Sequence, residues 1–159
     1  MPSLADFKST LKRRKAESTL QVLFKVARLL NEQAIGRVNR ERRSGLRLRP
    51  SHMALFPHLA LEGSRITMLA EQMQISKQAV AQVVEDLEQM GFVRRVPDPS
   101  DGRAKLVQFT KSGRNSMLQG LDLLSSMEQE LADIVGTKRI AELGKTLSTI
   151  LTHIEGSPV

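Results

Sequence analysis

Four polar residues near the middle of the chain carry side chains that can read the edges of DNA bases: Ser76, Lys77, Gln78 and Gln82. A glutamine can pair with adenine through two hydrogen bonds, and a lysine can donate to guanine. A serine at the start of a helix caps the backbone, and helix N-termini attract phosphate. The alternative is that these side chains simply face solvent on a helix surface. The secondary structure that carries them distinguishes the two interpretations.

Those elements have the layout of a helix-turn-helix. A short helix with Leu69 and Ala70 leads to a turn that ends at Ser76, and a second helix is expected over residues 77–90. Its apolar face is formed by Val80, Val83, Val84 and Leu87. Gly91 ends this helix. In the motif, the second helix enters the major groove with its N-terminal residues at the base edges. We therefore expect DNA contacts from Ser76, Lys77, Gln78, Ala79 and Gln82.

The segment Pro97–Arg103 has the composition of a hairpin tip, or wing. It reads Pro-Asp-Pro-Ser-Asp-Gly-Arg and lies between two strand-like runs, Phe92–Val96 and Lys105–Phe109. Arg103 is suited to the narrow minor groove, whose negative potential attracts arginine. Asp101 is expected to support the wing by pairing with that guanidinium. A surface ion pair with little energetic consequence is the alternative reading.

The two ends of the chain are predicted to form amphipathic helices. Apolar side chains recur at helical spacing over residues 17–40, in a long helix capped by Thr110, and in a last helix after Gly136. These helices are too apolar on one face to stand alone in water. We expect them to pack together and against a second copy of the chain.

Two short helices connect the first long helix to the turn. Ser51 is expected to cap one that runs to about Leu61, with Pro57 kinking it or marking its late turn. Thr67 is expected to cap the next. Gln74 stands in the turn where helix-turn-helix sequences often have glycine. A positive φ would cost glutamine roughly 1 kcal/mol there, so another type of turn is expected.

The charge of the chain suits a polyanionic partner. The formal net charge is +7, and residues 1–49 hold thirteen Lys and Arg against four Asp and Glu. Arg47 and Arg49 lie directly before the helix-turn-helix, and together with Thr67 they are expected to contact phosphates, which position a protein without specifying sequence. A solvated basic helix face is the alternative for any one of them.

Several classes of function are disfavoured. The chain has no cysteine and three histidines, so we expect no disulfide, no metal site and no cofactor. No apolar run approaches the ~20 residues of a membrane span, so a soluble cytoplasmic protein without a membrane partner is expected. No catalytic constellation is present, because the acidic cluster Glu85, Asp86 and Glu88 has ordinary solvent-facing spacing. We expect a non-enzyme.

In order along nearly the whole chain, these motifs resemble the MarR family of bacterial winged-helix regulators. The matching segments are Leu48-Arg-Pro-Ser51, Leu69-Ala70-Glu71, Ser76-Lys-Gln-Ala-Val80, Leu87-Glu88-x-x-Gly91-Phe-Val93, Asp98-Pro-Ser-Asp101-Gly-Arg103-Ala104 and Phe109-Thr110-Lys-Ser-Gly113. The helix-turn-helix alone is shared by many regulators. Its combination with the wing and Thr110-x-x-Gly113 at these separations makes the resemblance specific.

The resemblance implies a mainly α fold with a small β-hairpin wing. Residues 1–45 and 111–159 would form the helical dimerisation region around a winged helix-turn-helix at 46–110. It also implies a homodimer that binds palindromic double-stranded DNA as a transcriptional repressor, relieved by a small aromatic ligand. His52 and Phe56 would border that ligand pocket. The alternative function is an architectural, nucleoid-type DNA binder with little sequence preference.

Overall fold

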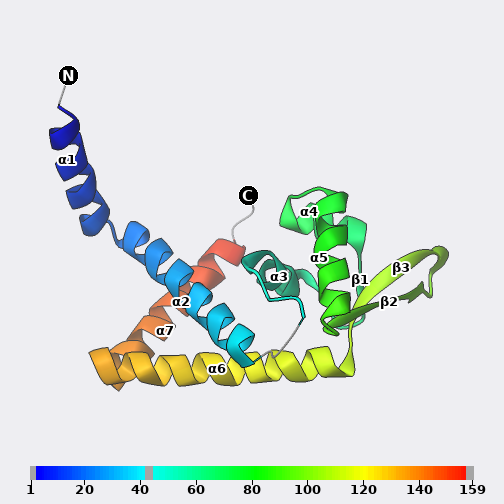
Figure 1. Cartoon of the computed structure of the whole chain (residues 1–159). Helices are drawn as coiled ribbons and strands as arrows, with labels where there is room; N and C mark the ends of the chain where they lie inside the picture. Colours follow the sequence, from blue (N-terminus) through cyan, green and yellow to red (C-terminus); the bar gives the residue numbers. More distant parts are fainter. Residues whose placement is uncertain (1–2, 42–44, 157–159) are drawn as a thin grey trace. The chain divides into compact units, whose positions relative to one another are not determined.

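The computed structural model describes residues 3–41 and 45–156. The pair Ser44-Gly45 is expected from the sequence to end the first long helix, and Ser44 lies outside the described residues. The chain divides into two compact units, Met1–Gly113 and Arg114–Val159. The elements, in order, are α1 (Leu4–Glu17), α2 (Thr19–Glu41), α3 (Pro50–Leu55), the 3₁₀ helix η1 (Phe56–His58), β1 (Ser64–Arg65), α4 (Ile66–Met73), α5 (Lys77–Gln89), β2 (Val93–Asp98), β3 (Asp101–Phe109), α6 (Lys111–Val135) and α7 (Thr137–Gly156) (Figure 1). The predicted mainly helical fold with a small β-hairpin wing is confirmed.

A three-stranded antiparallel sheet with the order β1-β3-β2 forms the wing and its base. Val107 of β3 pairs with Ser64 on one side and with Arg95 on the other. The β2–β3 hairpin was predicted, but β1 was not. A strand of two residues has no alternating pattern to detect, and it forms here only because β3 supplies its hydrogen-bonding partner.

The core of the first unit lies between α3, α4, α5 and the sheet. Its least exposed apolar side chains are Leu55, Leu69, Val80, Val84, Leu87 and Val107, none of which exposes measurable surface. Phe56 adds an aromatic cluster, with its ring centroid 5.9 Å from that of Phe92 and 5.8 Å from that of Phe109. The predicted apolar face of α5 therefore packs inward, which leaves its first turn free to face outward.

The turn between α4 and α5 uses a left-handed residue. Gln74 has φ of 54°, and its backbone N–H donates to the carbonyl oxygen of Glu71 at 3.2 Å. The expectation of another turn type is therefore wrong. This hydrogen bond and a second one, from the Ile75 N–H to the Ala70 carbonyl oxygen at 3.1 Å, close the end of α4. Together they offset the cost of the left-handed backbone at Gln74, which is roughly 1–2 kcal/mol.

The structure corrects one predicted helix start and adds a helix at the N-terminus. Thr67 is not a cap, because α4 begins at Ile66, and Arg65 holds the capping position without a capping hydrogen bond from its side chain. The pairing of β1 with β3 ends at Arg65, so the strand fixes where the helix starts. At the N-terminus the helix expected over residues 17–40 is α2, which begins at Thr19. The helix α1 before it was not predicted, and Ser18, whose extended backbone has ψ of 111°, separates the two.

The beginning of α6 lies against the backbone of Gly91 and Phe92, which follow α5. Thr110 caps it as predicted: its Oγ1 accepts the Gly113 N–H at 2.8 Å, and its hydroxyl donates to the Gly91 carbonyl at 2.6 Å. A Cβ at Gly113 would run into the backbone carbonyl of Phe92. The close approach of the Phe92 backbone therefore requires glycine at position 113.

Within the described residues, no helix is both long enough and apolar enough to span a bilayer. The same part of the chain holds no cluster of three or more His, Cys, Asp or Glu side chains with the geometry of a metal site.

Candidate nucleic-acid interface

The N-terminal turn of α5 presents polar side chains to solvent. Ser76 is the N-cap, as predicted, and its Oγ accepts the backbone N–H of Ala79 at 3.1 Å. Lys77, Gln78 and Ala79 are exposed, whereas Val80 is fully buried. The four expected contact residues Ser76–Ala79 thus lie together on the outer end of a helix whose other side is fixed in the core.

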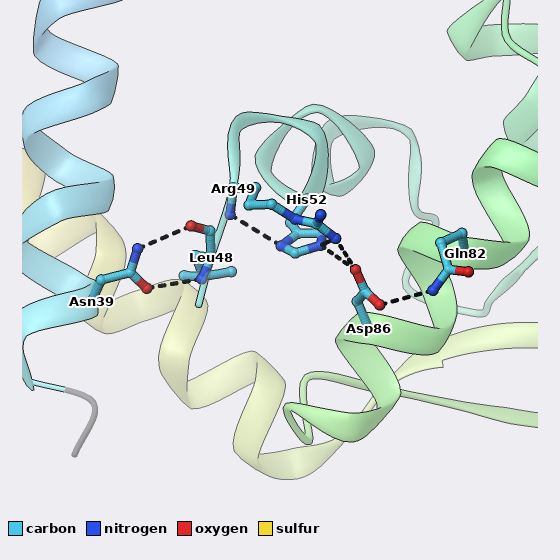
Figure 2. Close-up of polar contacts among 6 residues, drawn as sticks. All are labelled: Asn39, Leu48, Arg49, His52, Gln82 and Asp86. Atoms are coloured by element: carbon cyan, nitrogen blue, oxygen red, sulfur yellow. Dashed lines mark hydrogen bonds and ion pairs between the residues drawn. The ribbon is translucent and has the colours of Figure 1, made fainter. Parts of the chain in front are cut away.

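Gln82, one turn further along α5, is exposed but not free. Its Nε2 donates to Oδ1 of Asp86 at 3.0 Å. Asp86 is 5% exposed, so the interpretation of the acidic cluster as solvent-facing is wrong for this residue. Asp86 is buried because two residues far away in the sequence also bind its carboxylate. They are His52 of α3 and Arg49, which lie 34 and 37 positions away (Figure 2).

Hydrogen bonds keep the Asp86 carboxylate ionised. Those from Gln82 and His52 lower its pKa below the usual value, with help from the nearby charge of Arg49 and against the opposing effect of burial. The guanidinium of Arg49 binds Asp86 while 59% of its side chain stays exposed. Arg49 can therefore connect α5 to the segment directly before α3 (residues 45–49, here called the link) and still face a phosphate.

The link before α3 is fastened at a second point. Asn39 of α2 donates through Nδ2 to the Leu48 carbonyl at 2.9 Å and accepts the Leu48 N–H through Oδ1 at 2.8 Å (Figure 2). The backbone N–H and carbonyl groups of Leu48 thus both have hydrogen-bond partners, as polar groups of a buried residue require. Arg47, next to this clamp, is exposed, which is the position expected of a phosphate contact.

Thr67 lies in the first turn of α4, at the rim of a hollow of about 370 Å³. The hollow is lined by Arg65, Ile66, Thr67, Arg95, Ala104 and Lys105. Its cationic side chains come from β1, β2 and β3, so the structure brings Thr67 next to the base of the wing. Arg95 is not a free cation, because its guanidinium lies 2.5 Å from the Glu88 carboxylate.

The wing is organised around Asp98, which is 6% exposed. Its carboxylate accepts the Ser100 hydroxyl at 2.7 Å and the Ser100 backbone N–H at 2.8 Å, and Arg65 of β1 binds it at 2.6 Å. The Ser100 hydroxyl, followed by the Ser100 N–H and Arg65, lowers the pKa of Asp98 to about 2. Asp98 therefore stays ionised and ties the hairpin tip to its base.

Asp101 supports the wing differently from the expected guanidinium pair. Its Oδ1 accepts the backbone N–H of Arg103 at 3.1 Å, and its Oδ2 lies 3.8 Å from the Arg65 guanidinium. Among the described residues, the Arg103 side chain has no ion-pair partner, and it is exposed. Asp101 thus shapes the turn, which leaves the Arg103 side chain available to a ligand.

The two residues expected at a ligand pocket occupy core positions. His52 is fully buried and Phe56 is 7% exposed. Both ring nitrogens of His52 are engaged, Nδ1 by the Arg49 N–H at 3.1 Å and Nε2 by Asp86 at 3.1 Å. Phe56 contacts other aromatic rings. The structure brings these residues together with Arg49 and α5 rather than around an open cavity.

Sequence reasoning missed the carboxylates that hold the site in place. Asp86, Asp98 and Glu88 each bind an arginine from a different element. A signal was present for Asp98, whose Asp-Pro-Ser pattern is typical of a turn in which an Asp side chain binds backbone two residues on. No local pattern marks the burial of Asp86, because Arg49 and His52, two of its three partners, come from the link and α3.

A protein-family model and several solved structures are similar to this chain. A model of the MarR family matches residues 48–104. No curated protein sequence matches the chain. Among solved structures, MepR, a transcription regulator of the Staphylococcus aureus multidrug efflux pump MepA, is similar with a TM-score of 0.63 and 16% identity, over 86% of this chain and 98% of that one.

Two further structures are similar over most of their length. The transcriptional regulator BldR from Sulfolobus solfataricus has a TM-score of 0.60 and 22% identity, over 96% of this chain and 99% of its own. CouR, a transcriptional repressor bound to a 23-mer DNA duplex, has a TM-score of 0.60 and 21% identity, over 86% and 94%. The chain thus has the fold of these regulators over most of its length, and its residues 48–104, which hold the winged helix-turn-helix, are similar to the MarR family.

Proposed function

We propose that the chain is a homodimeric transcriptional repressor that binds a palindromic double-stranded DNA operator sequence-specifically. The observation that carries this proposal is the first turn of α5. Its polar residues Ser76, Lys77 and Gln78 face solvent together with Ala79, while the opposite side of the same helix is fixed in a dense core. A rigid, exposed helix N-terminus of this kind fits the major groove and can reach base edges there.

Three further groups would position the duplex. Arg47 and Arg49 in the link, with Thr67 at the start of α4, offer donors to phosphates and so give affinity without sequence preference. Arg103 at the wing has an exposed, unpaired guanidinium within the described structure, which suits the minor groove. CouR, the relative solved on a DNA duplex, supports duplex DNA as the partner.

The dimer is supported by the outer helices. Neither α1 nor α7 has a buried residue. Five apolar side chains of α7 lie on one helical stripe, each at least 37% exposed: Leu143, Leu147, Ile150, Leu151 and Ile154. Leu4 and Phe7 of α1 are 69% and 54% exposed. A second copy with the same stripes would cover them, and a two-fold dimer would present two copies of α5 to a palindrome.

Relief of repression by a small aromatic ligand is the part of the proposal that rests on the family resemblance. Because His52 and Phe56 are core residues, such a ligand would act beside them rather than by direct contact in this conformation.

The competing function is an architectural DNA binder, which the net charge of residues 1–49 favours. Selection of bound duplexes from a pool with a random central segment separates the two functions. The proposal expects enrichment of one inverted-repeat motif by the full chain. Binding with a steep salt dependence and no enriched motif would identify the architectural protein instead.

A further inference from the structure

The Asp86 carboxylate collects three side chains on the inner side of α5. Its Oδ2 binds the Arg49 guanidinium and lies 3.1 Å from Nε2 of His52, and its Oδ1 accepts from Gln82 at 3.0 Å (Figure 2). The Asp86 side chain is 8% exposed and that of His52 is fully buried. Gln82 is the outermost member of this group and is exposed. The network therefore runs from the core to the surface at the proposed reading face.

The hydrogen bond at the other ring nitrogen determines where His52 carries its proton. Nδ1 faces the backbone N–H of Arg49 at 3.1 Å, and a backbone N–H can only donate. Nδ1 must therefore be the unprotonated nitrogen, and Nε2–H donates to Asp86. The backbone position of Arg49 is in turn fixed by the neighbouring clamp between Asn39 and Leu48.

An ionised carboxylate also determines which way the Gln82 amide faces. The pKa of Asp86 is lowered, first by the Gln82 hydrogen bond and then by that of His52. A carboxylate can only accept hydrogen bonds, so the amide must turn its NH₂ group toward Asp86. The amide oxygen then faces away from the helix core. A free glutamine on a helix surface would have no such preference, because its amide could rotate by half a turn.

We propose that Asp86, positioned by His52 and Arg49, orients Gln82 so that its amide oxygen faces the major groove and selects a base with an exocyclic amino group, adenine first. Adenine offers N6–H to the oxygen and N7 to the second amide hydrogen. Cytosine offers only the amino group. Guanine and thymine present acceptors, O6 and O4, toward an oxygen that cannot rotate away. This inference rests on the proposed sequence-specific DNA binding.

Asp86 and His52 are thus positioning residues, while Gln82 is the group that touches the base. A merely structural role for the buried pair predicts a different result. Removing the carboxylate would then weaken folding or binding to all duplexes alike. A positioning role predicts that the base preference changes at one operator position and stays the same at the others.

The test uses the full chain and an operator obtained by selection, with every position in turn replaced by all four bases. Gln82→Ala should remove discrimination at one base pair in each half-site. At that pair the wild-type chain should prefer adenine by roughly 5- to 150-fold over guanine and thymine. Because Gln82 is exposed, this variant should fold normally. If the wild-type chain instead prefers guanine or thymine at that pair, the proposed orientation of the Gln82 amide is wrong, whatever the Asp86 variant shows.

Asp86→Asn tests the positioning residue itself. An asparagine amide can donate or accept, so Gln82 is no longer held in one orientation, and discrimination at the same pair should fall to within about 2-fold while other positions keep theirs. Glu85→Gln, which removes one exposed acidic charge from the same helix, should change nothing. Unchanged discrimination in Asp86→Asn would refute the positioning role. If the wild-type chain discriminated at no position, the proposed function itself would have failed instead.

Discussion

The winged helix buries its apolar side chains within one chain, whereas the outer helices α1 and α7 leave theirs exposed. In residues 48–109, hereafter the head, apolar side chains such as Leu55 and Leu87 are completely buried, and Asp86 and Asp98 are paired with arginines. In α1 and α7 no residue is buried, although both helices carry regularly spaced leucines. The head satisfies its groups within one chain, whereas these helices have apolar faces that a second copy would cover.

The largest expected effect comes from charging the apolar stripe of α7. Leu147→Glu places a carboxylate where the proposed dimer buries leucine, so the chain should sediment as a monomer near 17.7 kDa. Operator affinity should fall by roughly 100-fold or more, because the two heads are no longer linked. Circular dichroism should show that the head remains folded.

Thr152→Glu is the matched control, since it adds the same charge on the opposite side of α7, where Thr152 is exposed. This variant should remain dimeric. If Leu147→Glu were also dimeric, the stripe would not be the interface and the contrast between the two regions would have another cause.

Two glycines in α6 give the next largest effect. Alanine normally stabilises a helix by up to ~1 kcal/mol relative to glycine. Gly113→Ala should instead destabilise the chain by about 1–3 kcal/mol, because its Cβ meets the Phe92 carbonyl. Gly120→Ala, with nothing within 4 Å of its Cβ, should be neutral or stabilising.

Urea unfolding at one fixed protein concentration measures both glycine variants, because the stability of a dimer depends on concentration. Equal effects of the two substitutions would contradict the close approach of the Phe92 backbone to Gly113.

The wing offers a smaller change that should separate DNA binding from dimerisation. Arg103→Ala should weaken operator binding by about 1–2 kcal/mol and leave the sedimentation of the protein unchanged. Arg139→Ala removes an equal charge from the exposed surface of α7, and it should have little effect on affinity. Fluorescence anisotropy titrations at one salt concentration compare them. Equal losses would mean that only net charge matters and that the wing does not reach the duplex.

The smallest effect concerns acid stability. Since the folded-state pKa of Asp98 is lowered to about 2 from its usual value of 3.8, its ionised form stabilises the fold at pH values above about 4. This contribution should disappear as the pH falls from about 4 to about 2. Asp98→Asn should therefore be less stable than the wild type at pH 6, with the difference shrinking toward pH 2. A difference that is constant with pH would argue against the ionised contacts to Ser100 and Arg65.

Local patterns predicted the head well. The cap at Ser76 and the extent of α5 followed from helical periodicity and capping, which act within a few residues. The burial of Asp86 could not be predicted, because its spacing resembles a solvent-facing position and its partners, His52 and Arg49, lie 34 and 37 residues away. The Asp101 side chain was predicted to support the wing, but backbone geometry rather than sequence spacing decides which group of Arg103 it binds.

The central claim is that the head binds DNA, while the outer helices join two copies of the chain into a dimer with two heads. Binding to a selected operator with one of its two half-sites scrambled tests it most directly. With half-sites about one helical turn apart, the dimer should bind the intact site at least roughly 100-fold more tightly than the site with one scrambled half, at the same salt concentration. Equal affinity for the two duplexes would contradict the account, because a single head would then suffice for binding.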